Sequence, residues 1–417
     1  MKEHYSTLVI GGGTGGIMIA SQILAKGLDK NVGIVEPADF HFYQPAYTLV
    51  GAGTYDLEDT KRPMKSVIPA GADWIKHKVV KIAPDENKVI LDNNDEVGYD
   101  YLVVSPGLKQ DFSLVPGLQE IMDDPDSGAG SVYTDPEKVW RNIQNFKGGV
   151  ALFTQPTTPI KCGGAPQKLM YLAESAFKKT GARDKTKVVF ATNGSVIFGI
   201  KPIKETLMKV VDRKNINLKF GHNLVEIDPE EKIAWYEPNK NLGEYNDLGV
   251  EVLKKDDRIG IKFDFLHTAP PSVAPDFVKE AGLTKENGWL DVDQYSLQHN
   301  KYKNIFGIGD VAGLPTAKTG AAIRKQVPVV IDNIEKLKNG IDNFDKKYNG
   351  YSSCPLVTDY GKMVLAEFDY DGKFTPDPKL KWMFVFDSSK ESWILWLLKK
   401  FGLPYLYWNK MMKGKDV

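Results

Sequence analysis

The sequence is poor in cysteine, because Cys162 and Cys354 are the only two in 417 residues, and this excludes a scaffold of several disulfides. It has no excess charge, since 54 Lys and Arg balance 54 Asp and Glu, so no nucleic-acid partner is expected. No run of about 18 apolar residues is present, and no membrane span is predicted. No basic leader precedes Leu8, so we expect neither a signal nor a transit peptide. The six histidines lack the spacing of a metal site, and no metal is predicted.

The N-terminal residues have the pattern of a dinucleotide-binding βαβ unit. Residues 5–10 and 31–36 predict strands, and the periodic apolar residues of 17–26 predict a helix between them. The turn before the helix contains Gly11, Gly12, Gly13, Thr14, Gly15 and Gly16. Glycines at such a turn let the backbone approach a pyrophosphate at the helix N-terminus. Glu36 ends the second strand 20 positions after Gly16, where a carboxylate can accept hydrogen bonds from a ribose.

Two later elements favour FAD over NAD as the bound dinucleotide. Gly309 and Asp310 follow an apolar strand and resemble the Gly-Asp element of flavoproteins with two dinucleotide-binding domains. Ser105 and Gly107 follow another strand and resemble the Ala-Thr-Gly element of those proteins, with departures at the first two positions. Taken alone, Gly309 and Asp310 would be an ordinary turn after a strand. Together with the glycine turn, they predict FAD.

A second α/β region lies in the middle of the chain but lacks a glycine turn. Strands are predicted at 150–154 and 187–192, with helices at 166–179 and 204–213. The segment after the first of these strands contains two prolines and two threonines, which cannot form a close backbone cradle for a pyrophosphate. We therefore expect an electron donor other than NAD(P)H.

These patterns predict an α/β protein with two Rossmann-like dinucleotide-binding domains and a C-terminal unit. Residues 1–110 with 299–350 form the predicted FAD-binding domain, and residues 111–298 form the second domain, without a nucleotide fingerprint. Aromatic residues and lysines are frequent from 351 to 417, which predicts a C-terminal segment that associates with a membrane and its quinone.

Cys162 lies in a setting that favours a reactive thiol. Lys161 precedes it, a helix is predicted to begin near Pro166, and both a cation and a helix N-terminus stabilise a thiolate. We therefore expect a lowered pKa for Cys162, although an inert, packed thiol stays open as the alternative. Cys354 becomes a partner only if the fold brings the two Cα atoms to roughly 6 Å.

Five stretches of the chain carry a resemblance to a known family. Residues 41–45 (HFYQP), 157–168, 306–310, 351–357 (YSSCPLV) and 365–370 closely resemble sulfide:quinone oxidoreductases. The mitochondrial-type branch, which has two redox cysteines, is the best match, and the resemblance covers nearly the whole chain. The two cysteine motifs are its specific part, because glycine-rich turns occur in many families.

The resemblance implies a sulfur centre and a set of flavin contacts. It implies that Cys162 and Cys354 form a redox disulfide or a longer sulfur bridge on one face of the flavin. It also implies that further residues line the FAD, namely Gln44, Val79, Lys318, Thr319, Gly320 and Ala321. Arg324 and Lys325 are more basic than the family pattern, so the surroundings of the flavin's pyrimidine edge stay open.

The mechanism that follows as a hypothesis begins with thiol–disulfide exchange. Hydrosulfide attacks the bridge at Cys354, leaves a persulfide there and releases Cys162 as a thiolate. A thiol or a second sulfide then accepts the sulfane sulfur, and the electrons pass through FAD to a membrane quinone. An NADH:quinone reductase, a sulfide dehydrogenase that reduces a cytochrome, and a flavin redox sensor without catalysis are the alternatives.

The C-terminal residues predict contact with a lipid bilayer surface. Residues 393–401 and 403–413 combine Trp, Tyr and Leu with lysines, as interfacial helices do, and Gly402 with Pro404 predicts a hairpin of two short helices. A helix docked on the core, or a dimer interface, is the alternative. We expect a membrane-associated protein at the cytoplasmic face of a bacterial cell membrane, and a homo-oligomer is a further option.

Overall fold

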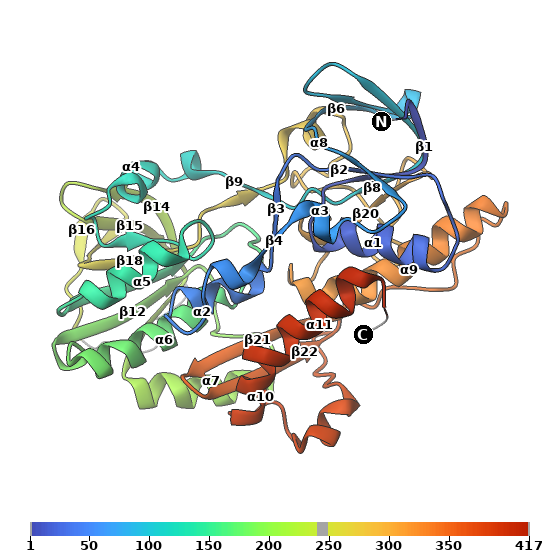
Figure 1. Ribbon diagram of the computed structural model, residues 1–417. Coiled ribbons are helices and arrows are strands. Elements are labelled where there is room, and N and C mark those ends of the chain that lie inside the picture. Colours follow the sequence, from blue (N-terminus) through green and yellow to red (C-terminus); the bar gives the residue numbers. More distant parts are fainter. Residues whose placement is uncertain (1, 240–248, 416–417) are drawn as a thin grey trace.

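The structure is a computed structural model that describes residues 2–239 and 249–415. Residue 1, residues 240–248 and residues 416–417 belong to the predicted ranges 1–110, 111–298 and 351–417, and they lie outside the described residues. Figure 1 shows two α/β units side by side, with the C-terminal elements running along the lower side of both.

The first unit is built on a sheet of seven strands. Their bounds are β1 His4–Ile10, β2 Val32–Val35, β5 Ala72–Ile75, β6 Val79–Ala83, β7 Lys88–Leu91, β8 Glu96–Val104 and β20 Ile305–Gly307. The order is β5-β2-β1-β8-β7-β6, and β20 pairs with β8 in parallel beyond the end of β7. The chain therefore returns to this sheet about 200 residues after leaving it. The domain boundaries predicted from the sequence stay a prediction.

Helices α1 (Thr14–Ala25) and α9 (Gly320–Lys338) pack together on the first sheet. Their apolar faces form one cluster with strand residues such as Val9 and Phe306. Helix α1 begins at Thr14, three residues before the predicted start. Gly16 permits this early start, because a Cβ atom there would lie 1.9 Å from the carbonyl oxygen of Gly11.

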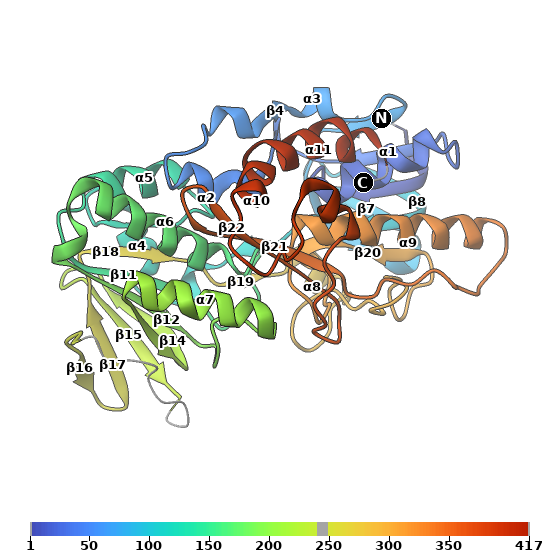
Figure 2. The same ribbon diagram turned by 90° about the horizontal axis from the view of Figure 1, so that it is seen from below.

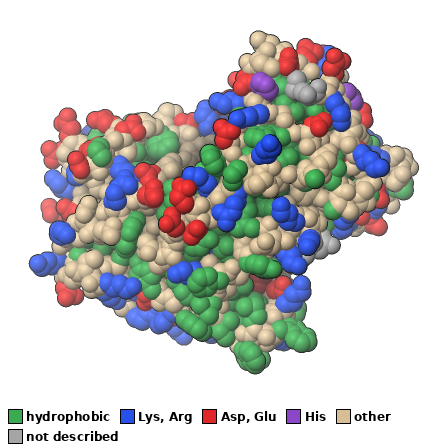
Figure 3. Space-filling view, viewed as in Figure 1, with side chains coloured by type: hydrophobic (Ala, Val, Ile, Leu, Met, Phe, Trp, Pro, Cys, Tyr) green, Lys and Arg blue, Asp and Glu red, His purple; other side chains and the backbone are tan. Residues whose placement is uncertain are grey.

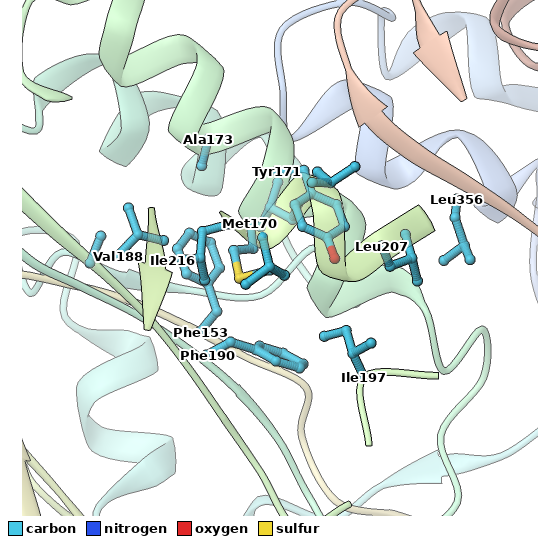
Figure 4. Packing of buried hydrophobic residues seen from close by; sticks show 14 of the residues in the cluster. Phe153, Met170, Tyr171, Ala173, Val188, Phe190, Ile197, Leu207, Ile216 and Leu356 are labelled. Carbon is cyan, nitrogen blue, oxygen red and sulfur yellow. The ribbon is translucent and has the colours of Figure 1, made fainter. Parts of the chain in front are cut away.

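The second unit has a parallel sheet of five strands in the order β10-β18-β11-β12-β13. Their bounds are β10 Ala129–Gly130, β11 Gly149–Gln155, β12 Thr186–Thr192, β13 Ile216–Phe220 and β18 Phe265–Thr268. The helices on this sheet are α5 Pro136–Asn145, α6 Ala165–Thr180 and α7 Lys201–Lys214. Buried residues of α6, including Met170 and Tyr171, pack against Phe153 and Phe190 of the sheet (Figure 4). This packing fixes the start of α6, where the Cys162 loop ends.

Smaller elements complete the two units. An antiparallel sheet contains β14 His222–Asp228, β15 Ile233–Pro238, β16 Leu253–Lys255 and β17 Arg258–Lys262. Two-stranded pairs are formed by β3 Phe40–Phe42 with β4 Lys61–Pro63 and by β9 Lys109–Gln110 with β19 Ser272–Val273. The short helices are α2 Tyr47–Val50, α3 Met64–Val67, α4 Leu118–Asp123 and α8 Asp276–Glu280.

The C-terminal region begins with a hairpin that packs between the two units. Strands β21 (Ser352–Asp359) and β22 (Lys362–Phe368) are antiparallel, and β21 contacts both α6 and α9 (Figure 2). Leu356 and its neighbours on the hairpin join the hydrophobic cluster of the second unit. Residues 351–417 were predicted to be a separate segment, whereas in the structure the hairpin shares its core with α6. The predicted C-terminal segment thus begins with a hairpin that packs on the second unit, and the boundary at 351 stays a prediction.

The hairpin of two helices predicted around Gly402 is wrong. Helix α10 (Trp393–Leu397) continues through a π-helical turn (Leu398–Gly402) into α11 (Leu403–Asn409), and Gly402 keeps helical angles of φ −69° and ψ −47°. The wider π turn precedes Pro404, which has no N–H to donate to the preceding turn. No helix within the described residues is long and apolar enough to cross a membrane.

A buried ion cluster fastens α6, α7 and β21 to one another. Glu174 on α6 has no exposed surface and accepts hydrogen bonds from Lys214 at 2.7 Å and Arg183 at 3.0 Å. Lys214, on α7, lies 3.4 Å from the carboxylate of Asp359 at the end of β21. The cluster therefore helps to hold the strand that carries Cys354 on the helix that follows Cys162.

We predict that Glu174→Met lowers the free energy of unfolding by about 3–5 kcal/mol, because Lys214 is left buried without its main counter-charge. Denaturant unfolding followed by tryptophan fluorescence measures the change. Lys178→Met is the matched control, since this exposed lysine pairs with the same carboxylate and its loss should cost less than about 1 kcal/mol. Equal losses in the two variants would contradict this account.

Candidate active site

Cys162 lies in the loop between β11 and α6, in a backbone conformation that side chains rarely adopt. Its φ is +52°, in the left-handed region. Three hydrogen bonds hold it there: its N–H donates to the carbonyl of Lys318 at 2.7 Å, and its carbonyl accepts from the N–H of Ala165 at 2.7 Å and from the hydroxyl of Tyr133 at 3.2 Å. The fold thus over-determines the position of this cysteine, as is common at functional sites.

The structure brings Cys354 to Cys162. Cys354 is buried on β21, its thiol shares a hydrogen bond with Cys162, and both thiols are free. Gly164 makes the approach possible, since a Cβ atom at that position would lie 2.7 Å from the sulfur of Cys354. Two cysteines from opposite halves of the chain therefore form one pair.

The two thiols differ in acidity. The hydrogen bond from Cys354 lowers the pKa of Cys162 well below its usual value, aided by the charge of Lys168 and opposed by burial. The same hydrogen bond, together with burial, raises the pKa of Cys354 well above its usual value. Cys162 is therefore the more acidic thiol of the pair and Cys354 the less acidic one, and the contact with Lys168 favours the charged form of Cys162.

The cation in direct contact with the thiolate is Lys168, and not the Lys161 that the sequence suggests. Lys168 on α6 is only 1% exposed, and its ammonium donates to the sulfur of Cys162 at 2.8 Å. Burial disfavours its charge, but Cys162 and Cys354 together outweigh that effect and the pKa of Lys168 is raised. Lys161 turns away and donates to the side-chain oxygen of Gln44 at 2.7 Å.

A second buried cation comes from the tail. Lys399 on the π-helical turn is buried and donates to the carbonyl of Pro45 at 2.7 Å. Burial and the like charge of Lys168 lower the pKa of Lys399 to about 7, although both thiols favour its charged form. The C-terminal helix thus contributes positive charge to the surroundings of the sulfur pair.

The predicted flavin contacts nearest the sulfur pair lie together. The ammonium of Lys318 donates to the carbonyls of Asp310 at 2.6 Å and Ala312 at 2.9 Å. Burial lowers the pKa of Lys318 to about 8 and raises the pKa of Asp310. Thr319 caps α9, and its hydroxyl is 2.9 Å from that of Ser352 on β21. Gly320 and Ala321 follow in the first turn of α9.

The glycine turn has the geometry of a dinucleotide cradle. A Cβ atom on Gly11 would lie 2.5 Å from the carbonyl oxygen of Ser105, whereas one on Gly13 would meet no atom within 4 Å. Helix α1 has no side-chain cap and no acidic residue in its first turn, so its first N–H groups are free for an anion. Glu36 accepts from the N–H of Gly12 at 2.7 Å, and its carboxylate oxygens keep further lone pairs.

The remaining residues predicted to contact FAD lie around the glycine turn, and some of them lie closer to it than others. The hydroxyl of Ser105 donates to the carbonyl of Ile10 at 2.9 Å, and Gly107 follows with a φ of +78°. Gly309 has a φ of +75°, directly after Ile308, which packs beside the turn. Val79 is less direct, because it lies buried at the start of β6 within the cluster of Ile10 and Val35. Its role in cofactor binding stays a prediction.

No group of three or more His, Cys, Asp or Glu within residues 2–239 and 249–415 could hold a metal ion. In the second unit, the loop between β11 and α6 holds Cys162 at the place where a nucleotide-binding unit has its glycine turn.

Comparison with known proteins decides the family. Residues 5–141 match the family described as pyridine nucleotide-disulphide oxidoreductase. The mitochondrial sulfide:quinone oxidoreductase of Mus musculus is 42% identical over 99% of this chain and 87% of its own length, and that of Dictyostelium discoideum is 39% identical over 100% and 87%. The chain belongs to the sulfide:quinone oxidoreductase family. The resemblance expected from the sequence is therefore confirmed.

The fold agrees with this family assignment. The crystal structure of the sulfide:quinone oxidoreductase from Aquifex aeolicus superposes with a TM-score of 0.77, covering 100% of this chain and 92% of that one at 21% identity. The predicted α/β class with two Rossmann-like units is confirmed, and the family implies a flavin-type cofactor. Relatives named as mitochondrial lend no support to the predicted cytoplasmic face of a bacterial membrane.

Several residues of the site were not predicted from the sequence. Lys168 and Lys399 could have been noticed in the sequence, since each lies next to a run of apolar residues in a predicted helix. Tyr133 has no such signal, because only the fold brings its hydroxyl to the Cys162 loop. The exposed aromatic residues between 382 and 386 were not predicted to contact a membrane, because they precede the segments 393–401 and 403–413.

We predict that Lys168→Gln moves the midpoint of the Cys162 thiolate titration upward by about 1–3 pH units, because a neighbouring positive charge is lost. The rate of iodoacetamide modification of the Cys162 peptide against pH, measured by mass spectrometry on reduced protein, gives the midpoint. Lys161→Gln is the control and should move it much less. A larger shift for Lys161→Gln would return the role to Lys161.

Proposed function

We propose that this enzyme oxidises sulfide to sulfane sulfur at Cys162 and Cys354 and transfers the two electrons through bound FAD to a quinone. The observation that carries this proposal is the asymmetric thiol pair, with one anionic sulfur beside Lys168 and one neutral sulfur. The names of the relatives, which state sulfide and quinone, support the same assignment.

The acidity difference gives the sulfur step a direction. In the oxidised pair, hydrosulfide forms a bond to the sulfur of Cys354, the bond between the cysteines breaks, and its electron pair leaves on Cys162. The thiol with the lower pKa is the better leaving group, so attack at Cys354 is favoured over attack at Cys162. Lys168 stabilises the Cys162 thiolate that forms, because its ammonium lies 2.8 Å from that sulfur when the two thiols are free. A thiol or a second sulfide then takes the outer sulfur of the Cys354 persulfide.

FAD is the flavin that the residues of the first unit would hold. The open space at Gly13, the free N–H groups of α1 and the carboxylate of Glu36 fit a pyrophosphate followed by a ribose. Gln44 and the 318–321 segment would lie toward its ring. Such a flavin supplies a two-electron acceptor between the sulfur pair and the quinone.

Reduction of a membrane quinone requires contact with a membrane surface. The surface at the lower end of the molecule is suited to such a contact. Figure 3 shows hydrophobic side chains gathered there, over the C-terminal elements, with lysines among them. We define the apolar patch by its most exposed members, Trp382, Phe384, Phe386, Trp393 and Phe401. Trp382 is 87% exposed, far more than a large aromatic residue usually is in water. We propose that this patch lies in the interfacial layer of a bilayer, and a homo-oligomer stays a prediction.

We predict that Cys162→Ser and Cys354→Ser each abolish the sulfide-dependent bleaching of the flavin, because serine cannot form the disulfide that hydrosulfide attacks. The measurement is an anaerobic titration of the purified yellow protein with sulfide, followed by a soluble quinone. The parent protein should bleach with sulfide and recover its absorbance with quinone. Both variants should keep their flavin.

Three other outcomes would overturn the proposed function. Bleaching by sulfide in either serine variant would remove the sulfur centre from the mechanism. Bleaching of the parent protein by NADH, with no response to sulfide, would make it an NADH:quinone reductase. Sulfide bleaching without turnover on added quinone would favour a redox sensor over an enzyme.

We predict that replacing Trp382, Phe384 and Phe386 together by serine weakens binding to phospholipid vesicles at least tenfold. Immersing one aromatic side chain contributes about 1.5–3 kcal/mol, and three are lost. Sedimentation with vesicles measures the bound fraction. Leu114→Ser is the control, because Leu114 is also exposed but lies in the second unit, away from the patch. Unchanged binding of the triple variant would place the membrane contact elsewhere.

A further inference from the structure

The C-terminal helix α11 is joined to the glycine turn by a chain of three hydrogen bonds. The hydroxyl of Tyr407 lies 2.5 Å from Nε2 of His41 and 2.8 Å from the hydroxyl of Thr14. Nδ1 of His41 lies 2.8 Å from the carbonyl oxygen of Gly12. Gly12 and Thr14 both belong to the turn that would receive the pyrophosphate. The tail therefore contacts the dinucleotide cradle directly, about 390 positions along the chain from it.

The donor and acceptor roles in this chain are fixed by elimination. The carbonyl of Gly12 can only accept, so Nδ1 of His41 carries the proton. Burial lowers the pKa of His41, which keeps the ring neutral at physiological pH and leaves Nε2 as an acceptor. Tyr407 therefore donates to His41, and Thr14 donates to the oxygen of Tyr407. Each hydrogen bond in the chain therefore has one donor and one acceptor.

The surrounding contacts show that this junction is packed rather than incidental. His41 and Tyr407 are both buried, and the rings of Tyr407 and Tyr43 lie 4.7 Å apart. Beyond α11, the hydroxyl of Ser21 on α1 donates to the carbonyl of Met412 at 3.1 Å. The tail is thus fastened to the first turn and to the middle of the helix that would hold the pyrophosphate.

We propose that Tyr407 and His41 form a latch through which the membrane-facing tail positions the glycine turn, so that tail docking and flavin retention are thermodynamically linked. The latch fixes the carbonyl of Gly12 and the side chain of Thr14 in the conformation that leaves the N–H groups of the turn open to phosphate. Linkage is reciprocal, so a bound flavin must also stabilise the docked tail by the same free energy. The proposal rests on the FAD site proposed above.

The latch also sets how Thr14 can serve the cofactor. Its hydroxyl proton is used on Tyr407, so the side chain has no proton left to donate to a phosphate. The backbone N–H of Thr14 is one of the free groups at the start of α1. Thr14 would therefore contact the pyrophosphate through its backbone, and its side chain acts as a positioning group.

The test uses the full-length protein and compares Tyr407→Phe with Tyr405→Phe. Tyr405 lies on the same helix, with its side chain largely exposed, and is the matched control. The rate of flavin release is followed by the recovery of free-flavin fluorescence after dilution. We expect release from Tyr407→Phe to be about tenfold faster, since two hydrogen bonds are lost, and release from Tyr405→Phe to match the parent. Equal release rates for Tyr407→Phe and the parent protein would overturn the latch.

A second pair of variants guards against a folding defect in Tyr407→Phe. Thr14→Val removes the donor to Tyr407 and should also speed flavin release, whereas Thr14→Ser keeps the hydroxyl and should restore slow release. Slow release from Thr14→Val would count against the latch. Absence of flavin from the parent protein itself would overturn the proposed function, and the latch with it.

The effect of bound flavin on the tail can also be measured. A tail contact with a purely structural role would not produce such an effect. Adding FAD to flavin-free parent protein should slow proteolysis of the segment after Ser389, and Tyr407→Phe should lose most of that protection. Equal protection in both proteins would contradict the linkage.

Discussion

Positive charge buried beside sulfur is the constraint on which the rest of the site depends. Lys168 and Lys399 are both withdrawn from water, and an isolated buried ammonium costs several kcal/mol. The two cysteines offset that cost for Lys168, and the hydrogen bond from Cys354 together with the charge of Lys168 lowers the pKa of Cys162. Helix α6, which carries Lys168, and strand β21, which carries Cys354, must therefore both be in place for the Cys162 thiolate to be stabilised.

The same dependence joins the two ends of the molecule. The tail supplies Lys399 to the surroundings of the sulfur pair and Tyr407 to the glycine turn. A single continuous helix therefore contacts both the sulfur site and the proposed dinucleotide site. The π-helical turn allows this, because it shifts the helix past Pro404 without breaking it.

Local sequence patterns predicted much of the fold and part of the site. The glycine turn, Glu36 and the Cys162 loop are each set by neighbouring residues, and their positions could be read from spacing. Lys161 was assigned in error because the direction of a side chain in a loop depends on distant partners, here Gln44. The contact of Cys354 with Cys162 could not be derived from spacing at all, since it depends on how the hairpin packs on α6.

The wide separation of the two cysteines also sets an order of events during synthesis. Cys354 follows Cys162 by 192 positions (354 minus 162), a distance that a ribosome adding roughly 5–20 residues per second covers in about 10–40 s. Until then Cys162 is a lone thiol without a partner, and Lys399 has still to be made. The growing chain therefore cannot handle sulfide, and its redox chemistry starts only once the elements that control it have emerged.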